Sequence, residues 1–162
     1  MRGYGQCSLI LYRGNVEMFL SEFNKKEAIA FVNLVEVLAN IDQVFAENEK
    51  ELLEEYIEEL SLSKEDIKKL DFESAIKELE GSTDRIKNII YFELVGLALS
   101  DGAYDEKEIQ FLMGLAARFN ISIEKQQEFI NYFKMVKEVY DSTFVDYESK
   151  LEYLKNIALD II

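Results

Sequence analysis

Chain-breaking residues are scarce in this sequence. Across 162 residues there is no proline, and only seven glycines are present. A β-rich chain of this length needs many turns, and turns draw heavily on both residue types. Long helices with short connections need far fewer prolines and glycines, so the sequence predicts an all-α fold. The length fits a single domain over residues 1–162, and a hydrophobic fraction of 49% can supply its core.

Two stretches of the chain are expected to form central helices. Asn24 and Glu27 have the spacing of a capping box, which predicts a helix from about Lys25 to Ile41. A second helix is expected from about Asp84 to Leu99, capped by Ser82 or Thr83. Both are apolar around nearly their whole circumference, a pattern typical of helices that are covered on several sides.

Amphipathic helices are expected to follow each of these apolar helices. Hydrophobic periodicity predicts them over about residues 47–60 and 106–119, and in the first of them the glutamates are expected to form a solvated face. Further helix starts, which bring the expected total to seven to nine helices, are predicted at Ser63 with Asp66, at Asp71, at Ser122 and at about Tyr147.

Residues 25–63 and 84–122 form an internal repeat with a shift of 59 residues. When residues 35–63 are aligned with 94–122, seven of the 29 positions are identical. The identical pairs are Leu38 and Leu97, Ala39 and Ala98, Asp42 and Asp101, Glu47 and Glu106, Glu49 and Glu108, Leu53 and Leu112, and Ser63 and Ser122. Each copy is expected to hold an apolar helix, a corner (the short connection) and an amphipathic helix, so the sequence predicts a helix–loop–helix duplication.

Four of the shared acids are candidates for a binding site. Asp42 and Asp101 fall at the C-terminal ends of their helices, where the helix dipole disfavours a carboxylate by roughly 0.3–1 kcal/mol. Seven residues later, Glu49 and Glu108 lie in the first turn of the next helix, where an acid is favoured. One interpretation is structural, with the aspartates accepting backbone hydrogen bonds in the corners and Glu108 completing a capping box with Asp105.

The other interpretation is that each Asp/Glu pair spans its corner and holds a divalent cation or a basic side chain of a partner. Oxygen-only ligands suit Ca²⁺, Mg²⁺ or Mn²⁺. The motif is not an EF-hand, because the twelfth position counted from either aspartate is a leucine, where that loop requires a bidentate glutamate. No organic cofactor is indicated.

The sequence offers few catalytic groups. It contains no histidine and a single cysteine. The lack of histidine excludes Ser-His-Asp and Cys-His nucleophile pairs, His-ligated zinc sites and the usual acid–base group at neutral pH. A catalytic site would need several carboxylates to converge on a metal, so we expect that the protein is not an enzyme.

Charge and hydropathy constrain the partners. The net charge is −14, from 32 acidic against 18 basic residues. Such a surface repels phosphates, so nucleic acid is not expected as a partner, whereas cations and basic protein surfaces are favoured. No apolar stretch approaches the roughly 20 residues of a spanning helix, and the first residues do not form a signal peptide. We therefore expect a cytoplasmic protein without direct membrane insertion.

The string Leu97-Ala98-Leu99-Ser100-Asp101-Gly102, followed by Glu108, resembles the signature of the tellurite-resistance TerB family. That group also includes the N-terminal domain of membrane-anchored DnaJ-type co-chaperones, and its members are all-helical and duplicated. The resemblance covers roughly residues 25–133, although Gln43 stands where the family usually has glycine. It implies a non-catalytic scaffold or sensor linked to stress response and to protein assembly at the membrane. It also implies divalent-cation binding by Asp42, Glu49, Asp101 and Glu108.

An alternative function needs no ligand at the acids. The chain could be an oligomerising protein, for example a homodimer, or a peptide-binding helical protein. Its 11 phenylalanines and nine tyrosines would supply contact residues at such an interface, although most of them belong to the core.

Overall fold

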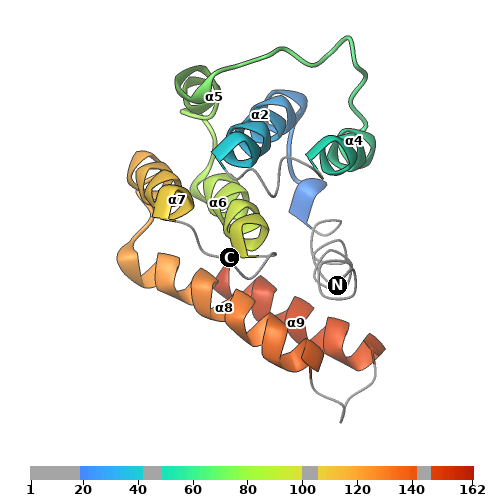
Figure 1. The fold of residues 1–162 in the computed structure, drawn as a ribbon, viewed down its shortest axis with the longest axis vertical. Coiled ribbons are helices and arrows are strands. Elements are labelled where there is room, and N and C mark those ends of the chain that lie inside the picture. The colour runs from blue at the N-terminus through green and yellow to red at the C-terminus, as the bar shows by residue number, and fades with distance from the viewer. Residues whose placement is uncertain (1–18, 42–48, 100–105, 142–146) are drawn as a thin grey trace.

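The computed structural model describes residues 19–41, 49–99, 106–141 and 147–162. Within these ranges the chain forms helices and no strand, which confirms the all-α prediction. None of the described helices has both the length and the apolar character that crossing a membrane requires. The helices in Figure 1 are α2 (Lys25–Ile41), α4 (Glu49–Glu59), α5 (Phe72–Glu78), α6 (Asp84–Leu99), α7 (Glu106–Arg118), α8 (Ile123–Asp141) and α9 (Tyr147–Ile161).

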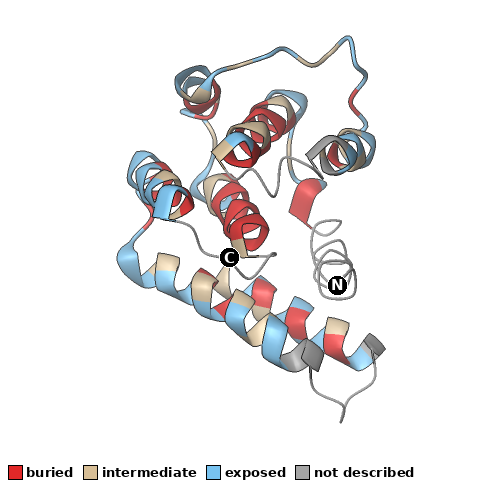
Figure 2. Cartoon of the chain, viewed as in Figure 1, coloured by how far each residue is buried: buried red, intermediate tan, exposed pale blue. Residues whose placement is uncertain are grey.

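Helices α2 and α6 occupy the centre of the fold. Helix α2 contacts α4, α5, α6 and α7, and α6 also contacts α7 and α8. Figure 2 shows that both central helices are buried along most of their surface. This burial confirms the prediction from their apolar circumference, because a helix without a polar face must be covered on several sides.

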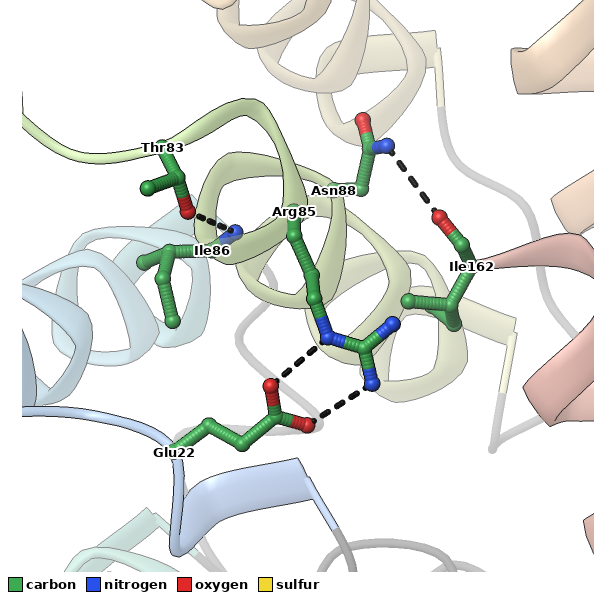
Figure 3. Close-up of polar contacts among 6 residues, drawn as sticks. All are labelled: Glu22, Thr83, Arg85, Ile86, Asn88 and Ile162. Atoms are coloured by element: carbon green, nitrogen blue, oxygen red, sulfur yellow. Dashed lines mark hydrogen bonds and ion pairs between the residues drawn. The ribbon is translucent and has the colours of Figure 1, made fainter.

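Hydrogen bonds at the helix starts explain where α2 and α6 begin. The amide of Asn24 donates to Glu27 Oε1 at 2.9 Å, and the amide of Glu27 donates to Asn24 Oδ1 at 2.8 Å, which confirms the capping box. At α6, Thr83 Oγ1 accepts from the amide of Ile86 at 3.2 Å (Figure 3). Ser82 Oγ donates to Glu27 Oε2 at 2.6 Å, so the carboxylate that caps α2 also ties the two helix starts together.

Helices α4 and α7 end with the same backbone geometry. Ser61 and Asn120, which are 59 residues apart, have positive φ angles of 54° and 57°. At each of these two residues, the amide donates to the carbonyl of the residue three positions earlier. The amide of the following residue donates to the carbonyl five positions before its own. These are the two bonds of a Schellman motif, in which a buried apolar residue commonly follows the left-handed one. That residue is Leu62 after α4 and Ile121 after α7, and both are buried.

The predicted short helix at Ser63 and Asp66 is wrong. The Asp66 carboxylate accepts from both the amide and the hydroxyl of Ser63, but these bonds close only a turn, after which the chain is irregular as far as α5. Asn33 of α2 holds this segment. Its Nδ2 donates to Lys68 O at 2.9 Å, and its Oδ1 accepts from the amide of Leu70 at 2.8 Å. These bonds satisfy main-chain groups that a helix would otherwise have paired.

The remaining predicted caps are confirmed. Asp71 Oδ1 accepts from the amide of Ser74 at 2.8 Å at the start of α5, and Ser122 Oγ accepts from the amide of Lys125 at 3.1 Å in the first turn of α8. Helix α9 begins at Tyr147, as expected.

Helices α8 and α9 pack against each other (Figure 1). An aromatic cluster joins α8 to the centre. Phe92 of α6 is fully buried, and four rings have centroids 4.8–5.8 Å from its own. The buried Tyr132 hydroxyl donates to Leu154 O of α9 at 3.2 Å. The four rings around Phe92 are those of Phe19, Phe129, Tyr132 and Phe133.

Polar side chains of α6 hold both ends of the described chain (Figure 3). Arg85 donates from Nε and Nη2 to the two carboxylate oxygens of Glu22 at 2.7 and 2.9 Å. This bidentate contact raises the pKa of Arg85 above its ordinary value. Further along the helix, Asn88 Nδ2 donates to Ile162 O at 3.4 Å. The segment before α2 and the residue after α9 are thereby both hydrogen-bonded to α6.

Candidate functional site

Two of the four predicted acids, Glu49 and Glu108, lie among the described residues. Asp42 and Asp101 lie outside the described residues. Glu108 is the third residue of α7 and lies in its first turn, as predicted. Glu49 lies on α4, whose described part begins with it. The side chain of Glu49 is outside the described part of the structure, whereas that of Glu108 is described.

Glu108 is a buried carboxylate. Only 1% of the residue is exposed, although the preceding residues Glu106 and Lys107 are exposed. Leu112 and Leu115 follow it at helical spacing and are also buried, so Glu108 lies on the face of α7 that packs into the core. Burying an ionised carboxylate costs several kcal/mol unless hydrogen bonds or a positive charge compensate for it.

A second fully buried acid, Glu93, was missed by the sequence analysis. It is 0% exposed and lies on α6 between the buried residues Phe92 and Leu94. One signal could have revealed it: a helix that is apolar all round leaves no solvated face, so a lone glutamate on it must be buried. The residue 59 positions earlier, which aligns with it in the sequence, is Leu34, which is also 0% exposed.

The two buried acids lie on helices that contact each other. Glu93 is six residues before the end of α6, Glu108 is the third residue of α7, and residues 100–105 connect the two helices. Neither acid is without an interaction partner. Two contacting helices therefore each bury one carboxylate, and the residues 59 positions earlier in the sequence are Leu34 and Glu49.

The described residues do not by themselves bring together the ligands of a metal site. Carboxylate oxygens are suitable donors for Ca²⁺, Mg²⁺ and Mn²⁺. In the part of the chain that the structure describes, no group of three or more His, Cys, Asp or Glu side chains could hold a metal ion. A complete oxygen cage would therefore need ligands from the corner itself, where Asp101 lies in the sequence.

Other acids have local explanations and do not point to a ligand. Contacts from Lys25 and from Ser63 lower the pKa of Asp66 from 3.8 to about 2. The backbone amide of Ser74 lowers the pKa of Asp71. A salt bridge to Arg118 at 2.7 Å lowers the pKa of Glu73. On α4 the predicted solvated face is confirmed for the exposed glutamates Glu51, Glu54, Glu58 and Glu59.

No protein-family model matches the chain, and neither a curated protein nor a solved structure matches it. The likeness to the TerB family therefore stands on the residues of the repeat.

Proposed function

We propose that this chain is a non-catalytic, TerB-like helical module whose second acidic corner binds a divalent cation. The observation that carries the proposal is the complete burial of two carboxylates, Glu93 and Glu108, on two contacting helices that lead into and out of that corner. A bound cation is one way to offset the cost of burying negative charge.

The burial of Glu108 favours a small ion over a basic side chain from a partner. A lysine or arginine of another protein would have to reach a residue that is 1% exposed, which would require α7 to move away from the core. A divalent ion forms bonds of about 2.4 Å to oxygen and fits between packed helices. We therefore assign Ca²⁺, Mg²⁺ or Mn²⁺ to this corner, with Glu93, Asp101 and Glu108 as its ligands.

The first corner would bind more weakly. Asp42 and Glu49 repeat the spacing of Asp101 and Glu108, but Leu34 stands where the second copy has Glu93. One carboxylate fewer lowers both the charge and the number of ligands that a cation meets.

The matching ends of the helices support an internal duplication, a feature of the TerB family. The N-caps of α2 and α6 are Asn24 and Thr83, and the left-handed residues after α4 and α7 are Ser61 and Asn120. Each pair is 59 residues apart, the same shift as in the sequence repeat. By the resemblance, such a module would act as a scaffold or sensor in a stress-response or membrane-associated protein complex.

Calorimetric titration of the full chain, freed of metal by a chelator, with millimolar Ca²⁺, Mg²⁺ or Mn²⁺ tests the cation. The variants Glu93→Gln and Glu108→Gln remove one charge each at nearly constant volume. We expect each to weaken binding by at least about tenfold. Glu106→Gln is the matched control, because Glu106 is exposed in the same helical turn.

Two results would count against the cation. If none of the three metals produces heat or a thermal shift, no cation binds. If Glu106→Gln and Glu108→Gln lose affinity for the metal equally, the loss reflects the change in net charge and not the removal of a metal ligand.

The alternative function, an oligomerising or peptide-binding helical protein, is favoured by a separate observation. Met113 of α7 and Ile123 of α8 are large apolar side chains with exposed fractions of 62% and 79%. Under this alternative, sedimentation velocity would show self-association that the double variant Met113→Glu, Ile123→Glu abolishes. A wild-type chain that sediments as a monomer throughout the micromolar range would argue against a homodimer.

A further inference from the structure

We draw no further inference here: the strongest candidate, the exposed glutamate face of α4 formed by Glu51, Glu54, Glu58 and Glu59, is an acidic cluster on a solvated helix, and nothing in the described part of the chain points to a ligand on it.

Discussion

Residues 24–63 and 83–122 begin and end alike, but they bury different side chains in the middle. At the aligned positions 33 and 92, the first segment has Asn33 and the second has Phe92. Asn33 hydrogen-bonds to the main chain of the segment before α5, whereas Phe92 packs against four aromatic rings. The next aligned positions hold an apolar Leu34 and an acidic Glu93, and both residues are fully buried.

The difference follows from what covers each central helix. After its amphipathic helix, the first segment continues as an irregular connection whose unpaired main-chain groups need a polar partner, and Asn33 provides it. The second segment continues directly into α8, whose aromatic side chains need an apolar partner, and Phe92 provides that. Helix ends are fixed by local hydrogen bonds and stay alike, while core positions adapt to their neighbours.

The largest expected effect is that of Phe92→Ala. Removing a fully buried ring that contacts four others leaves a cavity between α6 and α8 and should lower the free energy of unfolding by about 3–5 kcal/mol. Urea denaturation followed by circular dichroism measures this loss. A loss below about 1 kcal/mol would show that Phe92 does not hold α8 against the centre.

Asn33→Ala should cost less, by about 1–3 kcal/mol, because it leaves Lys68 O and the amide of Leu70 without their partner. The matched control is Asn88→Ala, which removes a single, longer bond, to Ile162 O at 3.4 Å, made by a less buried residue. The same denaturation experiment compares the two. Equal losses would mean that the irregular segment is not held by Asn33.

Glycine at the two left-handed positions should stabilise the protein by unequal amounts. Ser61→Gly relieves a conformation that costs an ordinary residue about 1 kcal/mol, whereas Asn120→Gly gains only a few tenths of that, because asparagine tolerates positive φ. Thermal unfolding should therefore show the larger rise in midpoint for Ser61→Gly. A fall in midpoint for both variants would contradict the shared Schellman geometry.

The smallest effect concerns pH. Lys25 and Ser63 lower the pKa of Asp66 from 3.8 to about 2, so the folded state favours the ionised carboxylate. Its contribution to stability is therefore present above pH 3.8 and is lost as the pH falls through about 2. The aligned residue of the second segment is Lys125, which is not a carboxylate.

Asp66→Asn should accordingly flatten the dependence of the unfolding midpoint on pH between about 5 and 2, and the change should be slight because Asp66 lies at the surface. Lys25→Gln, which removes the largest cause of the shift, should flatten it in part. An unchanged profile in both variants would mean that the turn at Ser63 does not contribute to acid stability.

Much of the fold could be predicted because its signals are local. Asn24 with Glu27, Asp71 and Ser122 act within a few residues, and the helices that they cap begin where expected. Ser63 and Asp66 carry the same kind of signal, but a cap closes only one turn, and no apolar stripe or continuing hydrogen-bond ladder extends it.

The buried polar side chains were harder to predict. Asn33 and Glu93 are single polar residues in apolar helices, and their role depends on neighbours that are distant in sequence. For Glu108, the spacing predicted its position in the first turn of α7, but not that the carboxylate is buried. Burial of that kind depends on how α7 rotates against the core, which a single helix does not determine.

The central claim, that the second corner is the main cation site, is tested most directly by the unfolding midpoints of the wild type, Glu49→Gln and Glu108→Gln in chelator and in millimolar Ca²⁺. The two variants change the same residue type at aligned positions of the repeat. Ca²⁺ at 100 times its dissociation constant should add about 2.7 kcal/mol to the stability of the wild type. We predict that Glu49→Gln keeps most of this gain and that Glu108→Gln loses at least about half of it, as a tenfold weaker affinity requires. A Glu108→Gln protein that Ca²⁺ stabilises as much as the wild type would contradict the account.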